Sequence, residues 1–144
     1  MTPERFRKLQ DILRRRQPDL SLLMDNVHKP HNLSAIVRSC DAVGVFEVHA
    51  VSHLPRVRAH KDAASGAGKW VRIQRHTELG AAVAQLKQAN MQILAAHLSE
   101  SAVDFRDIDY TRPTTIMLGA ELHGVSEQGL QLADQHIILS LIHI

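Results

Sequence analysis

One predicted helix in the first third of the chain combines an apolar stripe with charged groups at helical spacing. The stripe consists of Leu33, Ile36, Val37, Cys40 and Val43. Ser34, Arg38 and Asp41 are predicted to share the opposite face, at intervals of four and three residues. We expect Asn32 to cap this helix and Gly44 to end it. Arg38 would then present a fixed positive charge to an anionic ligand; the alternative is a solvated arginine paired with Ser34 or Asp41.

A second chemical feature is the sequence Leu-Gly-Ala-Glu-Leu-His-Gly at residues 118–124. It follows an apolar run typical of a buried strand and precedes a short helical pattern. Gly119 and Gly124 would permit positive φ angles or a close approach of the backbone to a ligand. A simple tight turn is the alternative interpretation.

The N-terminus is predicted to form a basic amphipathic helix over residues 3–16. Phe6, Leu9, Ile12 and Leu13 recur at helical intervals, with Thr2 as the N-cap and Pro3 at the first helical position. The other face carries the cations Arg5, Lys8, Arg14, Arg15 and Arg16. This helix is a candidate phosphate-binding arm, although each cation could equally serve only to solvate the helix.

The elements that must position these groups alternate along the chain. Predicted strands cover residues 20–24, 47–51, 71–75, 91–96, 114–118 and 136–139. Predicted helices cover residues 33–43, 78–89 (capped by Thr77) and 125–133. This alternation predicts an α/β fold with a parallel sheet and right-handed crossovers. Ligand sites in such sheets lie beyond the carboxyl ends of the strands, which here means residues 26–32, 96–99 and 119–124.

Composition limits the class of protein. The chain has 144 residues, 44% of them hydrophobic, which predicts one packed domain. No apolar run is long enough to span a bilayer and no secretory signal is present, so we expect a cytoplasmic protein. The single cysteine, Cys40, excludes an internal disulfide.

Charge is unevenly distributed along the chain. Residues 1–90 contain 15 Lys and Arg against 8 Asp and Glu, whereas residues 91–144 contain 2 against 7. A basic first part suggests an anionic partner such as nucleic acid.

Several common motifs are absent. Gly66-Ala67-Gly68-Lys69 lacks the spacing of a phosphate-binding P-loop. No dinucleotide fingerprint follows a strand, and no Gly-x-Ser-x-Gly nucleophile motif occurs. His28 and His31 lack the partners of a metal site, so no metal is expected.

Two motifs together point to a family. Asn32-x-x-Ala35-x-x-Arg38, followed by Gly119-x-Glu121-x-x-Gly124, resembles motifs one and two of the SpoU-type RNA 2′-O-ribose methyltransferases, the trefoil-knotted (SPOUT) class. Further stretches are similar to the members that modify guanosine 18 of tRNA, namely residues 15–20, 28–32, 41–44 and 103–110. The resemblance extends from residue 1 to about residue 139.

The resemblance implies transfer of a methyl group from S-adenosylmethionine to the ribose 2′-hydroxyl of guanosine 18 in the D-loop of tRNA, by a homodimer with a SPOUT-type sheet. It assigns catalytic roles to Arg38, Asn32 and Glu121. Arginine stays protonated, so Arg38 would orient phosphate and stabilise the attacking oxygen and would not act as a base. Asn32 would support the start of its helix, and Glu121 would hold the cofactor loop or a dimer contact.

The resemblance also implies binding sites for the cofactor and the RNA. The cofactor residues are Ala96, Leu98, Gly119 and Leu139. The RNA-binding residues are Lys8, Arg14, Arg15, Arg16 and Arg38. Position 96 usually bears a hydroxyl in this subgroup, so Ala96 would remove one side-chain hydrogen bond.

The expected organisation is a basic helical arm over residues 1–19 and a methyltransferase domain over residues 20–144. After Leu139 the family continues with Pro-Met-x-Gly and then with motif three, Ser-Leu-Asn-Val-Ser, which forms the knot. This chain reads Ser140-Leu141-Ile142-His143-Ile144. We therefore expect a form that stops before motif three and lacks turnover; the alternative is a non-catalytic RNA-binding fragment that uses the basic arm.

Overall fold

The computed structural model describes residues 1–52 and 69–139. Its strands are β1 (Gln17–Asp25), β2 (Val45–Val51), β3 (Arg72–His76), β4 (Gln92–Ala96), β5 (Val103–Asp104), β6 (Thr114–Leu118) and β7 (Gln135–Ile138). The helices are α1 (Pro3–Arg14), α2 (Pro30–Val43), α3 (Leu79–Gln88), α4 (Glu127–Leu132) and the short 3₁₀ turn η2 (Phe105–Asp107). The predicted α/β class is confirmed. Residues 66–68 of the rejected P-loop and residues 140–144 lie outside the described ranges.

All strand pairings of the named strands are parallel, in the order β3-β2-β1-β6-β4-β7-β5. The centre of the sheet joins two distant parts of the chain, because β1 pairs with β6 over Leu20–Met24 and Thr114–Leu118. Met24 is opposite Leu118 in this register, so the loops that follow β1 and β6 leave the sheet side by side. This edge is the one that the sequence pattern indicated.

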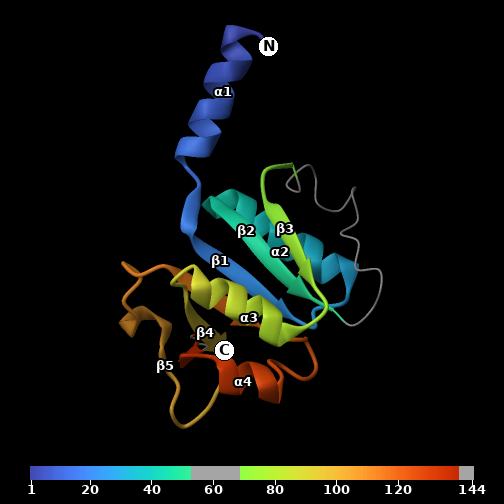
Figure 1. Ribbon diagram of the computed structural model, residues 1–144, viewed down its shortest axis with the longest axis vertical. Coiled ribbons are helices and arrows are strands. Elements are labelled where there is room, and N and C mark those ends of the chain that lie inside the picture. Colours follow the sequence, from blue (N-terminus) through green and yellow to red (C-terminus); the bar gives the residue numbers. More distant parts are fainter. Residues whose placement is uncertain (53–68, 140–144) are drawn as a thin grey trace.

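Helices cover the two faces of the sheet (Figure 1). On one face, α2 buries Leu33, Val37 and Cys40 against Val48 and Ala50 of β2. On the other face, α3 and the residues around α4 enclose a second cluster that includes Val83, Ile93 and Met117. The strands in the middle of the sheet therefore carry buried apolar side chains on both faces, as expected for a parallel sheet, although β1, β2 and β6 also bury polar residues such as Ser21, His49 and Thr115.

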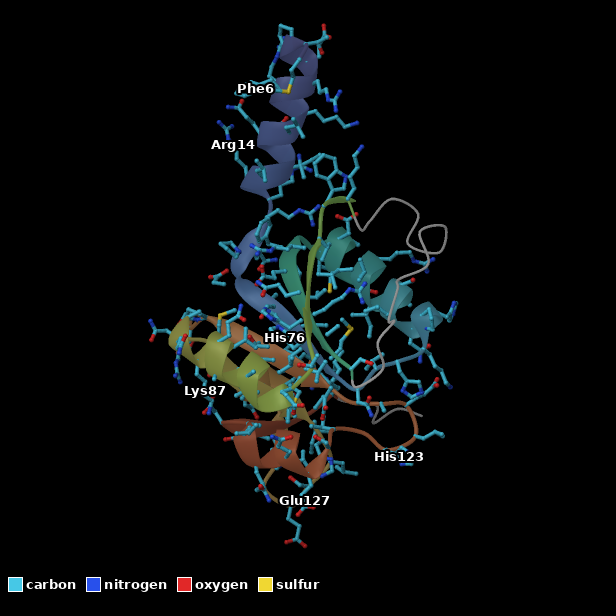
Figure 2. All side chains as sticks on the ribbon, turned by 45° about the vertical axis from the view of Figure 1, so that its right-hand side comes forward. Phe6, Arg14, His76, Lys87, His123 and Glu127 are labelled. Atoms are coloured by element: carbon cyan, nitrogen blue, oxygen red, sulfur yellow. The ribbon has the colours of Figure 1, made fainter. Side chains whose placement is uncertain are left out.

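Helix α1 stands away from this body, and none of its residues is buried (Figures 1 and 2). The predicted cap is confirmed: Thr2 Oγ1 accepts a hydrogen bond from the Arg5 amide at 3.3 Å. The helix ends at Arg14, two residues earlier than predicted. Within the described parts of the chain, no helix is long and apolar enough to cross a membrane.

Three details of the helices differ from the sequence-based expectation. Lys29, not Asn32, precedes α2, because Pro30 begins the helix and places Asn32 within its first turn. Glu78, not Thr77, is the N-cap of α3. Ser34 is only 1% exposed and belongs to the buried residues of α2, together with Leu33, Val37 and Cys40, and not to the solvent face with Arg38.

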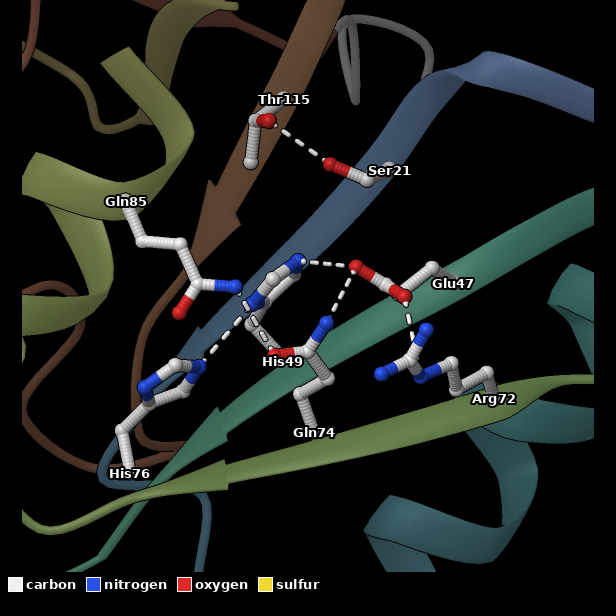
Figure 3. A network of polar contacts seen from close by, with 8 residues as sticks. All are labelled: Ser21, Glu47, His49, Arg72, Gln74, His76, Gln85 and Thr115. Carbon is white, nitrogen blue, oxygen red and sulfur yellow. Dashed lines mark hydrogen bonds and ion pairs between the residues drawn. The ribbon is translucent and has the colours of Figure 1, made fainter. Parts of the chain in front are cut away.

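A polar network occupies the α3 side of β2 and β3 (Figure 3). His49 Nε2 lies 3.1 Å from Glu47 Oε1, and His49 Nδ1 lies 3.0 Å from His76 Nε2. Because a carboxylate only accepts, neutral His49 donates to Glu47 through Nε2 and accepts from His76 through Nδ1. Burial lowers the pKa of both histidines, and for His49 this outweighs the opposing effect of the Glu47 charge.

Candidate active site

The loops after β1 and β6 meet at the carboxyl edge of the sheet and enclose a cavity of about 240 Å³. Residues 26–29 and Asn32 line one side, and residues 120–123 line the other. The two motifs that the sequence singled out are thus brought together from positions some ninety residues apart. The cavity lies at the end of the sheet opposite the arm, as the positions of His123 and Arg14 show (Figure 2).

Glu121 connects the two loops. Its Oε2 accepts from Lys29 Nζ at 2.6 Å, and its side chain also forms a hydrogen bond with Asn32. These two hydrogen bonds, together with the Lys29 charge, lower the pKa of Glu121 below its ordinary value. Glu121 is therefore an ionised acceptor at neutral pH and is unsuited to act as a general acid. Lys29 is the residue that the sequence interpretation missed, although it lies within the stretch 28–32 that supports the family resemblance.

The loop after β6 closes on itself. Ala120 and Gly124 exchange two backbone hydrogen bonds, of 3.0 and 2.7 Å. A Cβ on Gly119 would collide with the backbone of Gly124 and Val125, whereas Gly124 needs its φ of +67° and has open space around it. Gly119 is thus required by its own loop, independently of any ligand.

Asp25 holds the far end of this loop. The residue is 4% exposed, and its Oδ2 accepts from the Ser126 amide at 2.7 Å. A Cβ on Gly129 would lie 3.0 Å from the same oxygen, so α4 packs closely over the carboxylate. Sequence reasoning missed this contact; the available signal was a carboxylate directly after an apolar strand.

The four predicted cofactor residues lie at the ends of three adjacent strands. Gly119 follows β6, Ala96 ends β4, and Leu139 follows β7, while β4 pairs with both neighbours. Leu98 is 79% exposed and Leu139 is 44% exposed at this edge. Ala96 offers main-chain groups only, as the sequence indicated.

His136 stabilises the same edge from the α4 side. Its Nε2 donates to the Leu130 carbonyl at 3.0 Å, which leaves Nδ1 to accept from Ser99 Oγ at 3.1 Å in the neutral ring. His97 packs edge-on against the ring, with centroids 5.7 Å apart. These contacts attach the loop after β4 to α4.

Arg38 is exposed on α2 and does not line the cavity of about 240 Å³. It lies six residues beyond Asn32, which corresponds to about 9 Å along the helix axis. The structure therefore brings Asn32 and Glu121 together, with Gly119 at the start of the loop that carries Glu121, whereas Arg38 lies further along α2 and is not among the residues that line the cavity.

The predicted RNA-binding residues also separate into two groups. Lys8, Arg14 and Arg15 are exposed on the arm. Arg16 is not: its side chain is 9% exposed, and Nη2 lies 2.5 Å from Asp41 Oδ1. In the described ranges, no cluster of three His, Cys, Asp or Glu side chains has the arrangement of a metal site.

Comparison with known proteins decides the family. Residues 19–142 match the SpoU rRNA Methylase family. The chain belongs to this family. Among SpoU relatives, the tRNA (guanosine(18)-2′-O)-methyltransferase of Escherichia coli K12 is 54% identical over 142 residues, which are 99% of this chain and 62% of the relative. The enzyme of the same name from Thermus thermophilus is 48% identical, over 98% of this chain and 73% of the relative.

Solved SpoU structures agree with the fold. The Aquifex aeolicus TrmH/SpoU tRNA modifying enzyme superposes with a TM-score of 0.87 at 37% identity, and the match covers 96% of this chain and 71% of that one. The SpoU methyltransferase AviRb of Streptomyces viridochromogenes, in complex with AdoMet, has a TM-score of 0.76 at 22% identity, covering 87% and 50%. The second likeness concerns the fold alone. The chain spans 62% of the length of its E. coli relative.

Proposed function

We propose that this chain carries the motif-one and motif-two part of a tRNA 2′-O-methyltransferase that acts on guanosine 18 with S-adenosylmethionine as the methyl donor. The observation that carries the proposal is the contact of Glu121 with Asn32 and Lys29, which joins the two motifs at the carboxyl edge of β1 and β6. The 54% identity to an E. coli enzyme whose name states this reaction supports the choice of substrate.

The carboxyl ends of strands β6, β4 and β7 would bind S-adenosylmethionine. Exposed apolar side chains of Leu98 and Leu139 suit the flat face of an adenosyl group, and Ala96 and Gly119, at the ends of the adjacent strands, could contribute only main-chain contacts beside them. S-adenosylmethionine, when bound, supplies a methyl group already activated by the sulfonium charge. The task left to the protein is to align a ribose hydroxyl with that group.

The charged residues divide the remaining tasks. Arg38 would bind an RNA phosphate and stabilise the oxygen as negative charge develops on it. Glu121, ionised by its partners, would keep Lys29 and Asn32 in place and so fix the mouth of the cavity. Lys8, Arg14 and Arg15 would contact tRNA phosphates along the arm.

Arg38 is exposed and is not among the residues that line the cavity of its own chain, and the family resemblance implies a homodimer. We propose that the working unit is a homodimer in the cytoplasm. In this dimer, one subunit would present Arg38 near the ends of β6, β4 and β7 of the other subunit, where the methyl donor would bind.

The test measures transfer of a labelled methyl group to tRNA. It compares the 144-residue chain with a chimera that continues, after Leu139, into the remaining sequence of the E. coli relative. The chimera is chosen because motif three follows this position in the SpoU-type methyltransferases. We expect the chimera to methylate tRNA, and to lose activity both with Arg38→Gln and with tRNA that carries 2′-deoxyguanosine at position 18.

Three outcomes bear on the proposal. Methylation that persists on the 2′-deoxy substrate would contradict the proposed target atom. Binding of tRNA without transfer by the chimera would favour the alternative, an RNA-binding protein without catalysis. Turnover by the 144-residue chain alone would contradict the expectation that motif three is needed.

A further inference from the structure

The arm and the body meet at a junction formed by residues 16–17 and 41–45. Arg16 Nη2 lies 2.5 Å from Asp41 Oδ1, and its Nη1 donates to the Asp41 and Val45 carbonyls, each at 3.4 Å. The Gln17 amide donates to the Gly44 carbonyl at 2.8 Å, and Gln17 Nε2 donates to the Val43 carbonyl at 2.9 Å. Carbonyls in the last turn of α2 are thus bound by Arg16 and by Gln17, the first residue of β1.

Gly44 completes the contact. It ends α2 in the left-handed region, at a φ of +82°, and a Cβ at this position would collide with the Arg15 carbonyl. The backbone of the arm therefore lies directly against the end of α2. The arm is a fixed extension of the body, although α1 itself has no buried residue.

Helix α2 is the physical link between the arm and the candidate active site. It begins beside the cavity, where Asn32 contacts Glu121, and ends at the junction, about 21 Å further along its axis. Arg38 lies between the two ends. A group that binds the end of α2 therefore sets where the arm points relative to Arg38.

We propose that Arg16 is a positioning residue for RNA and not a phosphate contact. By binding the end of α2, it fixes the direction in which Arg14 and Arg15 are presented. The guanidinium suits this task because its planar fork reaches one carboxylate and two carbonyls at once, whereas a lysine would supply a single point charge. The inference rests on the proposed function, since it assumes that the arm binds tRNA.

The test measures the affinity of the chain for fluorescently labelled tRNA at several salt concentrations. Arg15→Gln should make the negative slope of log affinity against log salt shallower by about 0.9, which corresponds to the loss of one phosphate contact. Arg16→Lys should weaken binding about three- to tenfold with the slope unchanged, because an arm without fixed direction must be ordered on binding.

The change in tRNA affinity caused by Asp41→Asn distinguishes Arg16 as a positioning residue from Arg16 as a phosphate contact, because the two roles predict changes of opposite sign. Removing a negative charge and freeing Arg16 would strengthen binding if Arg16 contacted phosphate. We expect weaker binding, by about the same three- to tenfold factor as Arg16→Lys, since the same junction is lost. Arg106→Lys and Asp104→Asn are the matched controls, because they alter another intramolecular arginine–aspartate pair, 3.3 Å apart, away from the arm. Neither control should weaken binding.

A structural measurement keeps the result interpretable. Hydrogen exchange of the Gln17 amide, which donates to Gly44, should accelerate in Arg16→Lys and Asp41→Asn and remain slow in both controls. Tighter binding by Asp41→Asn, or wild-type affinity for Arg16→Lys, would overturn the inference while leaving the proposed function intact. A wild-type chain that fails to bind tRNA would overturn both.

Discussion

The Asp25 carboxylate accepts a hydrogen bond of 2.7 Å from the Ser126 amide, 101 residues later in the chain. This contact ties the end of β1 to the start of α4, and the loop that carries Glu121 lies between β6 and that point. Asp25→Ala should lower the free energy of unfolding by about 2 kcal/mol, because the part-buried hydrogen bond from the Ser126 amide loses its acceptor and the buried carboxylate is removed. Urea denaturation measures the change. Asp19→Ala, an exposed carboxylate of the same strand, should change stability by less than about 0.5 kcal/mol.

The two glycines of the motif-two loop should differ in their sensitivity. Gly119→Ala should cost about 3 kcal/mol of stability, because the added methyl group meets backbone that cannot move aside. Gly124→Ala should cost about 1 kcal/mol, since only its positive φ is unfavourable and the surrounding space is open. Thermal and urea unfolding of both variants test the order; equal costs would contradict the described loop geometry.

The carboxyl group of Glu121 should titrate below the ordinary range for glutamate. Lys29→Gln should raise this pKa toward its usual value, because the strongest of its hydrogen bonds and the adjacent charge are both lost. Lys29→Arg should retain most of the effect, and Asn32→Ala should produce a smaller rise than Lys29→Gln. Carbon-detected NMR titration of the side chain measures each value. An unchanged pKa in Lys29→Gln would contradict the 2.6 Å contact.

The histidine pair should make stability depend on pH. Burial lowers the pKa of His49 and His76 in the folded protein, so below about pH 6.5 the unfolded chain binds more protons than the folded chain. The contribution of the two neutral histidines to the free energy of unfolding is therefore fully present above about pH 7. It is lost as the pH falls, by at most ~1.4 kcal/mol per pH unit for each histidine. The urea midpoint between pH 5 and pH 8 measures this trend.

A double variant, His49→Gln with His76→Gln, should flatten that profile. Val83→Ala is the control, because it removes buried methyl groups beneath α3 and lowers stability without removing a titratable group. The urea midpoint of Val83→Ala should be lower than that of the wild type at every pH, but it should change with pH as steeply as in the wild type. A double variant that retains the full slope would place the responsible groups elsewhere.

Regular elements were predictable from sequence because the apolar periodicity that defines them is also what the fold buries. The run Thr114–Leu118 is the same in prediction and structure, and Gly44 ends α2 as expected. The prediction of helix caps was wrong where one side chain could form either a local hydrogen bond or a hydrogen bond with a distant residue. Asn32 is a good N-cap by type, but Pro30 begins the helix earlier and the amide binds Glu121 across the loops.

The candidate site was predictable only in part. The motifs located Asn32, Gly119 and Glu121 at one edge of the sheet, but nothing in local spacing indicates that Asp25 would reach Ser126 or that Arg16 would bind Asp41. Both contacts join segments far apart in the chain and depend on the order of the strands. The two-residue strand β5 was missed because two residues cannot display a period.

The pairing of β1 with β6 has a consequence for the growing polypeptide during translation. The first strand to leave the ribosome acquires one lateral neighbour, β2, almost immediately, but its other edge must wait until about ninety more residues have been synthesised. Until then a hydrophobic strand edge stays open, and the two loops of the candidate active site remain apart. Nascent chains arrested before residue 118 should consequently be the species most prone to aggregation and most dependent on chaperones.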